Sequence, residues 1–554
     1  MPHRPQSRRL CLAVLAAGLV SGCASMSGTG AEDGRIDPAR LSATVSVLAS
    51  DDFEGRAPTT PGEDKTVAWI ADQFQALGLE PAGDDGGWYQ TVPIARFVQD
   101  GPAVITARTG GETLTLRRGA DIIANSQRPQ NHITISDAPV VFAGYGVSAP
   151  ERDWDDFKGV DLRGKVVLML VNDPDFEVAS DNPTADRFDG RGMTYYGRWV
   201  YKFEEAARRG AAAVFVIHET EAAGYPWTTL QNSSTAPGLD IVRADPVAER
   251  VLAQGWIQQA RAARLMSGAG LDYATLKTAA QSSDFRPVTL DGVTMSLDFG
   301  QTFDRQTTRN VVAKLTGTIR PDETILYGAH WDAYGRAAPN AAGDDIYNGA
   351  VDNATGVAAV LELARLYAEA PRTERTVMFM AWAAEEAGLL GAYHYAANPL
   401  VPLETTVVNV NMDSLLPGPA APEIVVIGYG KTDAQDRLAR LAAAEARTLI
   451  PDPAPQVGAF YRSDHFPLAR MGVPALFAAA GFTGATEASR AYVSDRYHQP
   501  TDDWSPAWSM EGAAKDVQLL YAFGRGLADG DDWPAWAPGN EFEAVREASA
   551  ASRR

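Results

Sequence analysis

The chain has 554 residues and a formal net charge of −21, with 45% hydrophobic and 21% charged residues. This composition is ordinary for a globular protein with a sizeable core, and the length allows for several domains. Nucleic acid needs Lys and Arg to neutralise its phosphates, so the acidic balance argues against a nucleic-acid partner.

The first 23 residues (1–23) have the pattern of a signal peptide. A basic stretch precedes the apolar run LCLAVLAAGLV, which is too short to span a bilayer. Val20-Ser21-Gly22-Cys23 follows and resembles a bacterial lipobox, in which the cysteine becomes the lipidated first residue of the mature chain. A plain cleavage near Ala24 is the alternative, and Arg8-Arg9 leaves Sec and twin-arginine export both open. We therefore expect an exported protein, either secreted or held in the periplasm or at the outer membrane as a lipoprotein.

Three segments of different character follow the signal peptide. Residues 24–36 are small and polar and indicate a flexible tether. Residues 37–95 contain two runs with helical spacing, ARLSATVSVLASDDFEGR and DKTVAWIADQFQALGLEP. Residues 96–295 contain short strand patterns with turn signals, such as ITARTGGETLTLRR and GKVVLMLVND. We expect residues 96–295 to form an inserted, mostly β module.

Residues 296–540 alternate strand patterns with helix patterns. The predicted strands are NVVAKLTG, ETILYGAHWD, TVMFMAWA, ETTVVNVNMDS and PALFAAAG. The predicted helices are GVAAVLELARLYAEA, GLLGAYHYAANP and DAQDRLARLAAAEARTLI. This alternation predicts an α/β fold with a mostly parallel central sheet flanked by helices. Residues 541–554 are expected to be a tail that frays.

Acidic and imidazole side chains follow the predicted strands of this α/β segment. They are His330, Asp332, Glu385, Glu386 and Asp413, and they are joined by Asp352 before a helix and His498 in a late loop. Open α/β sheets bind ligands in the crevice beyond the carboxyl ends of their strands. The sequence therefore predicts that these side chains converge on one place.

The kinds of side chain in this cluster indicate a metal centre. The only cysteines, Cys11 and Cys23, precede the predicted domains, so a metal would be held by His, Asp and Glu. Such nitrogen and oxygen ligands suit zinc, and manganese or cobalt less well. Two histidines with several carboxylates can hold two ions if one carboxylate bridges them, as in two-metal hydrolases. Asp332 is placed to orient the imidazole of His330.

Five motifs in this segment resemble those of a known family. HWD, DNATG, AAEEAG, NMD and YHQPTD occur in the order seen in the zinc-dependent exopeptidases of the bacterial leucine-type aminopeptidase family. Glutamate carboxypeptidases, the transferrin receptor and glutaminyl cyclases are related to the same family. The stretch YYGRWVYKFEEAARRGAAAVFVIHE is similar to a protease-associated domain. The resemblance implies a peptidase domain formed by residues 37–95 and 296–540, with the protease-associated domain inside residues 96–295.

The resemblance also implies roles for single residues and two Zn²⁺ ions per chain. It assigns His330 and Asp413 to one zinc, Glu386 and His498 to the other, Asp352 to the bridge, Glu385 to the general base and Tyr497 to the oxyanion. The Ser-Leu-Leu that follows Asp413 departs from the Met and Gly of many members. Arg462-Ser463-Asp464-His465 is similar to a further signature, and His465 is not expected to bind metal.

Each of these residues also has an ordinary structural explanation. His330 could be a core histidine, Asp352 a carboxylate at a helix N-terminus, and the two glutamates a solvated helical turn. Tyr497 could simply pack against its neighbours. The agreement of five motifs favours the metal centre. The remaining histidines, His132, His218 and His394, are expected to be structural or superficial.

The sequence thus predicts a zinc metallo-exopeptidase that acts on peptides, and specifically an aminopeptidase. A glutaminyl cyclase-like enzyme with one zinc, a carboxypeptidase of the same family and a non-catalytic binding ectodomain are the alternatives. A carboxypeptidase needs arginines for the terminal carboxylate, and Arg462 and Arg496 lie near the motifs. Membrane contact is expected only through the N-terminal lipid, and the oligomeric state is not predicted.

Overall fold

The computed structural model describes residue 1 and residues 34–553, apart from 235–236, 338, 341 and 480–485. The predicted signal peptide and nearly all of the predicted tether lie outside the described residues. The chain divides into Met1–Arg35 and Ile36–Arg554, and the second unit holds the helices and strands. In the described part of the chain, no helix is both long enough and apolar enough to cross a membrane.

A mostly parallel sheet forms the centre of the α/β segment, as predicted. Its strands are β12 (Val288–Leu315), β13 (Arg320–His330), β16 (Arg375–Trp382), β17 (Thr406–Asn411), β18 (Glu423–Ile427), β19 (Thr448–Pro451) and β20 (Ala475–Ala479). β13 pairs in parallel with both β16 and β17, and β17 pairs in parallel with β20. β12 is antiparallel to β16, and β18 is antiparallel to β20 and parallel to β19. The short β1 (Glu80–Pro81) pairs with β12.

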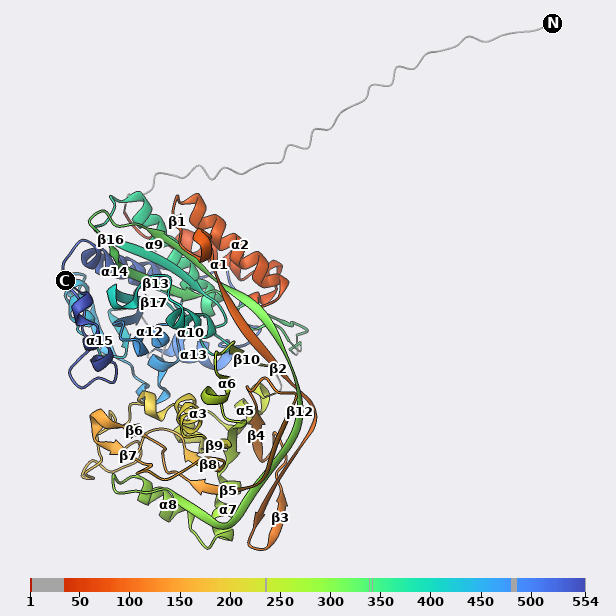
Figure 1. Cartoon of the computed structure of the whole chain (residues 1–554). Helices are drawn as coiled ribbons and strands as arrows, with labels where there is room; N and C mark the ends of the chain where they lie inside the picture. The colour runs from red at the N-terminus through yellow and green to blue at the C-terminus, as the bar shows by residue number, and fades with distance from the viewer. Residues whose placement is uncertain (2–33, 235–236, 338, 341, 480–485, 554) are drawn as a thin grey trace. The chain divides into compact units, whose positions relative to one another are not determined.

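Helices cover both faces of this sheet (Figure 1). One face packs against α1 (Pro38–Leu48), α2 (Pro61–Ala76), α9 (Thr355–Glu369), α11 (Ala434–Ala444) and α14 (Glu511–Ala528). The other packs against α10 (Leu390–Ala397) and α12 (His465–Arg470). Alternate strand residues point to opposite faces, so Tyr327 and Phe379 join the first core, and Leu326 and Met380 join the second.

Two predicted elements differ from the structure. The helix predicted for residues 433–450 ends at Ala444, because Ala446 adopts a left-handed φ of 57° and the following Thr-Leu-Ile forms β19. The expected tail contains α15 (Glu543–Ala548), and the buried guanidinium of Arg546 donates to the Thr406 carbonyl at 3.1 Å. This part of the tail is therefore packed against the domain rather than frayed. The remaining helix of the α/β segment is α13 (Glu487–Asp495).

The segment expected as an insertion combines strands with helices. Its strands are β2 (Tyr89–Thr109), β3 (Glu112–Thr115), β4 (Ile122–Asn125), β5 (His132–Phe142), β6 (Ser148–Ala149), β7 (Trp154–Asp155), β8 (Val166–Leu170), β9 (Ala213–His218), β10 (Gly238–Ile241) and β11 (Ala253–Gln258). Its helices are α3 (Trp199–Arg208), α4 (Thr220–Ala223), α5 (Trp227–Ser233), α6 (Pro246–Glu249), α7 (Gln259–Gly268) and α8 (Tyr273–Ala280). β5, β8, β9 and β11 pair in parallel, and α3 and α7 pack on opposite faces of them.

Two long strands join the inserted segment to the α/β segment. β2 and β12 pair antiparallel from Tyr89–Val311 to Arg108–Thr294, and β12 also pairs with β16 at one end and β5 at the other. A single sheet therefore continues from one segment into the other (Figure 1). Side chains add to this connection, since Arg470 forms an ion pair with Glu204 at 3.1 Å.

A buried arginine fixes the loops at the carboxyl edge of the sheet. Arg56, at the end of the turn η1 (Asp51–Arg56), is fully buried. Its guanidinium donates to four backbone carbonyls at 2.6–2.9 Å, those of Leu48, Trp331, Asn348 and Gly349. These bonds join the loop after β13 to the segment that precedes α9.

We expect Arg56→Ala to lower the free energy of unfolding by about 3 kcal/mol or more, because it leaves four buried carbonyls without a donor. Arg108→Ala is the control, since that side chain is 69% exposed and its loss should change stability by only about 0.5 kcal/mol. Urea unfolding of both variants and of the unmodified protein, each freed of metal with a chelator, measures both effects. Equal midpoints for the two variants would show that Arg56 has no such role.

Candidate metal centre

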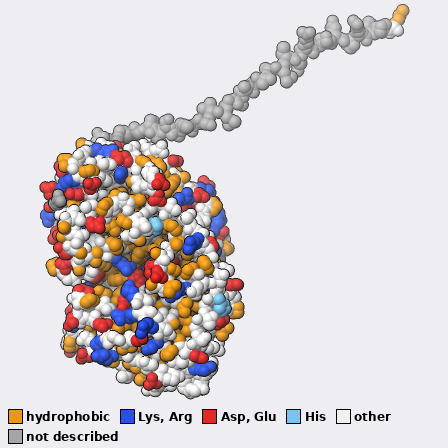
Figure 2. Space-filling model, viewed as in Figure 1, with side chains coloured by type: hydrophobic (Ala, Val, Ile, Leu, Met, Phe, Trp, Pro, Cys, Tyr) orange, Lys and Arg blue, Asp and Glu red, His pale blue; other side chains and the backbone are white. Residues whose placement is uncertain are grey.

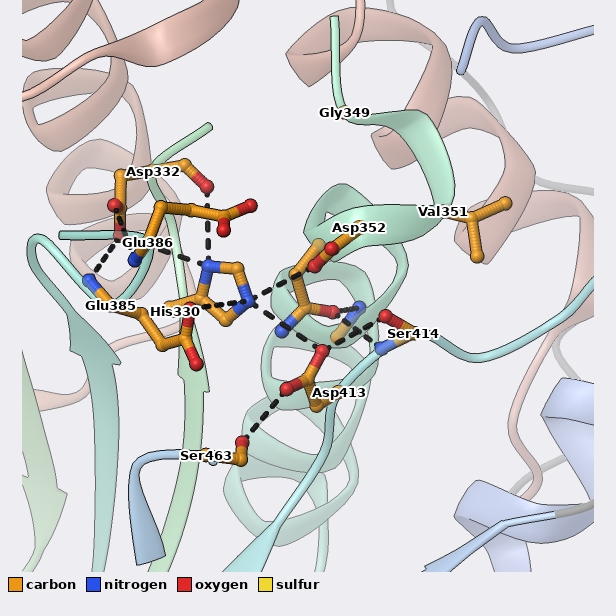
Figure 3. Close-up of polar contacts among 12 residues, drawn as sticks. His330, Asp332, Gly349, Val351, Asp352, Glu385, Glu386, Asp413, Ser414 and Ser463 are labelled. Atoms are coloured by element: carbon orange, nitrogen blue, oxygen red, sulfur yellow. Dashed lines mark hydrogen bonds and ion pairs between the residues drawn. The ribbon is translucent and has the colours of Figure 1, made fainter. Parts of the chain in front are cut away.

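The predicted ligands converge at the carboxyl edge of the sheet, and Figure 3 shows His330, Asp352, Glu386 and Asp413 among them. His330 ends β13, Glu385 and Glu386 follow β16, Asp413 follows β17, Asp352 lies in the turn η5 (Ala350–Ala354) before α9, and His498 follows α13. Ala384 adopts a left-handed φ of 54°, so the chain turns sharply between β16 and the two glutamates. The convergence that the sequence predicts is therefore present in the fold.

Two groups of metal-binding side chains share one carboxylate. His330 Nε2 lies 3.2 Å from Asp352 Oδ1 and 3.5 Å from Asp413 Oδ1. His498 Nε2 lies 3.2 Å from Asp352 Oδ2 and 3.4 Å from Glu386 Oε2. In each group the ligand atoms lie within 4.8 Å of one another. Asp352 thus presents one oxygen to each group, which is the arrangement that a bridging carboxylate needs.

Glu385 lies beside these groups without joining either. Its Oε2 is 4.0 Å from His330 Nε2, and among the described residues the two groups consist of other side chains. A carboxylate in this position can reach a reacting water and remain free of the metal. The two neighbouring glutamates therefore occupy different places, as the sequence interpretation requires.

Asp332 contacts the imidazole of His330 mainly through its backbone oxygen. His330 Nδ1 lies 3.1 Å from the backbone oxygen of Asp332 and 3.7 Å from its carboxylate. An Nδ1–H that donates to this carbonyl leaves the Nε2 lone pair facing Asp352 and Asp413. The carboxylate instead accepts the backbone N–H groups of Glu385 at 3.0 Å and Glu386 at 3.3 Å. Asp332 therefore fixes both the histidine and the glutamate loop.

The shared carboxylate is held by a residue that the sequence analysis did not single out. Asp502, buried at the end of the YHQPTD motif, accepts the backbone N–H groups of Val351 at 3.1 Å and Asp352 at 3.0 Å. Its own carboxylate also accepts the Tyr492 hydroxyl at 3.2 Å. At Gly356, a Cβ would lie 2.5 Å from the Met412 carbonyl oxygen, so only glycine lets α9 begin this close to β17.

Hydroxyl groups fix two further ligands. Ser463 Oγ and Ser414 Oγ donate to the carboxylate of Asp413 at 2.8 and 2.9 Å (Figure 3). The serine that departs from the family pattern thus supports the ligand it follows. The Tyr334 hydroxyl lies 3.0 Å from His498 Nδ1. Tyr334 stands in the loop after β13, and no sequence spacing connects it with His498.

Burial and mutual repulsion shift the pKa values in this cluster. Burial raises the pKa of Glu386 to about 8, with Asp352 adding to the shift and His498 opposing it. Burial also raises the pKa of Glu385 well above its usual value, against the attraction of His330. For His330, burial alone would lower the pKa, but Glu385 and the neighbouring aspartates raise it well above its usual value. The cluster concentrates negative charge that a cation would stabilise.

The donor atoms fit divalent metal ions. His330 Nε2, His498 Nε2 and Glu386 Oε1 are buried and have no hydrogen-bond partner among the described residues. Buried polar atoms are normally hydrogen-bonded, so these unsatisfied atoms at the centre of two His–carboxylate groups indicate ligands for a metal. The nitrogen and oxygen donors, without thiolate, suit zinc.

The remaining candidate residues occupy distinct positions. The Tyr497 ring stacks on the His498 ring with centroids 3.6 Å apart, and both line the cavity beside the cluster. Arg462 lines the same cavity, whereas Arg496 is bound to the carbonyls of Thr501 and Asp503. His465 packs against two phenylalanine rings, and neither it nor His132, His218 and His394 belongs to the metal-binding groups.

Comparison with known proteins supports the class of the site. Residues 310–522 match the model of peptidase family M28, and this segment contains every predicted metal ligand and the predicted base. This part of the chain is therefore similar to peptidase family M28, in agreement with the resemblance of the motifs. The protease-associated domain stays a prediction.

Individual relatives share parts of this sequence. The chain is 45% identical over 86 residues to a probable zinc metalloprotease of Pyrenophora teres f. teres (strain 0-1), covering 16% of this chain and 18% of that protein. It is 32% identical over 114 residues to the aminopeptidase NAALADL1 of Mus musculus, covering 20% and 14%. The chain thus spans less than a fifth of the length of these curated relatives.

A solved structure shares the fold over most of the chain. The aminopeptidase from Aneurinibacillus sp. strain AM-1 is similar over 89% of this chain and 94% of its own, with a TM-score of 0.50 and 20% identity. The α/β architecture with a large, mostly parallel sheet is therefore shared with a known aminopeptidase.

We expect the affinity of the centre for Zn²⁺ to fall as the pH is lowered, because each ligand must lose its proton before it binds. A raised pKa keeps the proton bound at higher pH, so protons compete with the metal until the pH exceeds the pKa of Glu386, about 8. Each displaced proton should weaken binding by about tenfold per pH unit below that value. Competition with a chelator measures this dependence, and equal affinity at acidic and alkaline pH would contradict it.

Proposed function

We propose that the chain is a zinc metallo-exopeptidase, and specifically an aminopeptidase that removes N-terminal residues from peptides with two zinc ions. The observation that carries the proposal is the shared carboxylate of Asp352 between two His–carboxylate groups, with Glu385 beside them. The proposed ligands are His330, Asp413, Asp352, Glu386 and His498. The M28 match over residues 310–522 supports the same class of reaction.

The chain's own side chains account for the proton transfers of peptide hydrolysis. When bound, two such ions polarise the scissile carbonyl and lower the pKa of water towards about 7. Glu385 takes a proton from the attacking water and returns it to the leaving amine, and burial, which raises its pKa, helps it to hold that proton between the two steps. The Tyr497 hydroxyl, next to His498, is proposed to donate a hydrogen bond to the oxyanion.

The centre offers a place for a substrate's free amine. That amine would be held by the carboxylates around Asp352 together with a metal ion, so that the first peptide bond meets Glu385, which suits exopeptidase rather than endopeptidase cleavage. A cyclase with one metal would need only one of the two ligand groups, and a binding ectodomain would need neither. Both groups are complete, which favours the two-metal hydrolase over these alternatives.

The proposal is tested by substituting the two adjacent glutamates separately. Glu385→Ala should keep two zinc ions per chain and lower kcat by about 10²–10⁴-fold, because it removes the base. Glu386→Ala should lose zinc, because it removes a ligand. Metal analysis together with hydrolysis of aminoacyl-nitroanilides, with and without chelator, measures both effects.

Controls define the direction of cleavage and the role of the base. Asp345→Asn, in the exposed loop before Asp352, should behave as the unmodified protein. N-acetylated peptides should resist cleavage by an aminopeptidase and remain substrates for a carboxypeptidase. Unchanged kcat in Glu385→Ala would remove Glu385 from the mechanism.

We also propose that the chain is exported and anchored by a lipid on Cys23, as a lipoprotein of the periplasm or outer membrane. The support is the sequence of residues 1–23 alone. Growth with a labelled fatty acid should label the unmodified protein and leave Cys23→Ala unlabelled. Label in both variants, or in neither, would contradict the lipid anchor.

A further inference from the structure

A cavity of about 710 Å³ lies between the metal centre and the inserted segment. Glu385, Glu386 and His498 line it from the α/β side, and Arg198 and Trp256 line it from the inserted side. Hydrophobic, basic and acidic side chains also meet across the middle of the face seen in Figure 2. Sites of about 300–1,000 Å³ accommodate small molecules, so a short peptide fits this space.

Two arginines in this cavity have no anionic partner among the residues that the structure describes. Arg198 precedes α3 in the inserted segment, and Arg462 lies just before Ser463, which binds Asp413. No described carboxylate lies within ion-pair distance of either guanidinium, and Arg198 Nε is buried without a hydrogen-bond partner. The internal stretches outside the described residues contain no Asp or Glu.

Other arginines of the inserted segment do find carboxylates. Arg243 and Arg250 both bind Asp240, at 2.8 and 2.9 Å, and Arg209 binds Glu205 at 2.6 Å. Arg118 and Arg128 lack such a carboxylate but donate to backbone carbonyls, whereas no described atom accepts a hydrogen bond from Arg198 Nε.

The charge of Arg462 adds to the cost of burying the Arg198 guanidinium. Burial, together with this charge, lowers the pKa of Arg198 to about 10, so Arg198 is a cation at neutral pH. A partly desolvated cation is stabilised when an anion pairs with it, and guanidinium binds carboxylate through two parallel hydrogen bonds. Arg198 thus lacks the anion that its burial calls for, and the exposed Arg462 adds a second guanidinium to the same cavity.

We propose that Arg198 and Arg462 bind a carboxylate of a short peptide whose N-terminus lies at the metal centre. This inference rests on the proposed peptidase function, because the arginines share the cavity with Glu385 and Tyr497. A dipeptide can reach both groups at once, with its N-terminus at the metal centre and its carboxylate at the two arginines. The inserted segment, through Arg198, then contributes directly to substrate selection.

Two sources of carboxylate fit this chemistry, and substrates separate them. Leu-Ala carries a C-terminal carboxylate, Leu-Ala-amide carries none, and Leu-Glu-amide carries one only on its side chain. The ratio of kcat/KM for Leu-Ala to that for Leu-Ala-amide should exceed tenfold and should fall about tenfold in Arg198→Gln and in Arg462→Gln. Arg264→Gln, an exposed arginine of the same segment, should keep the unmodified ratio.

Binding is measured separately from cleavage, so the two proposals can fail independently. Calorimetry with zinc-loaded Glu385→Ala should show that Leu-Ala binds more tightly than Leu-Ala-amide, and that adding Arg198→Gln abolishes the difference. Leu-Glu-amide binding as tightly as Leu-Ala would identify a side-chain carboxylate as a sufficient ligand. Equal binding of Leu-Ala, Leu-Ala-amide and Leu-Glu-amide would overturn the carboxylate site, whether or not the enzyme cleaves them. Absence of all cleavage by the zinc-loaded protein would overturn the peptidase function alone.

Discussion

One carboxylate has to face two imidazoles at once, and the architecture of the site follows from that requirement. Asp352 can do so only if its backbone is fixed, and the fixation comes from residues that are far away in the sequence. Asp502 accepts two consecutive backbone N–H groups at Val351 and Asp352. Arg56 holds the carbonyls of Asn348 and Gly349 just upstream. The geometry of the shared ligand is therefore determined by groups that do not bind metal themselves.

Positively charged side chains lie on two sides of the acidic cluster. The acidic cluster faces Arg56 on its buried side, where Asp332, Asp502 and Asp352 favour the charged guanidinium even though burial lowers its pKa to about 10. On its open side the cluster faces the cavity that contains Arg198 and Arg462. A peptide with free ends carries the opposite polarity, with a cation at one terminus and an anion at the other. The arginines would thus complement the carboxylate end of the proposed substrate, whereas bound metal ions would offset the negative charge at the other end.

Much of the fold and the grouping of the candidate ligands could be predicted from the sequence, because both rest on local patterns. Apolar runs followed by His330, Glu386 or Asp413 mark the carboxyl ends of buried strands, and parallel strands bring those ends to one edge. The boundary between α11 and β19 was missed, because Leu449 and Ile450 continue an apolar pattern that suits either element. The helix ends where Ala446 adopts a left-handed conformation, and spacing does not reveal this.

The supporting contacts could not be predicted, because they join residues far apart in the chain. Tyr334 meets His498 across 164 positions, and Arg56 reaches Trp331 across 275. For Asp332, the sequence did not show which of its atoms would make each contact. Its position in the motif indicated a partner for the imidazole, but its carboxylate binds the backbone of the glutamate loop and its carbonyl faces the ring. A motif identifies which residues belong together more reliably than which atoms they use.

The pairing of β2 with β12 brings the two ends of the inserted segment side by side. The chain leaves the α/β sheet on one of these strands and returns on the other, and the two are hydrogen-bonded neighbours. Residues can therefore be added or removed beyond that ladder without altering the register of β13 against β16. Evolution can reshape the wall of the cavity opposite the metal centre, including the position of Arg198, while the ligands stay where they are.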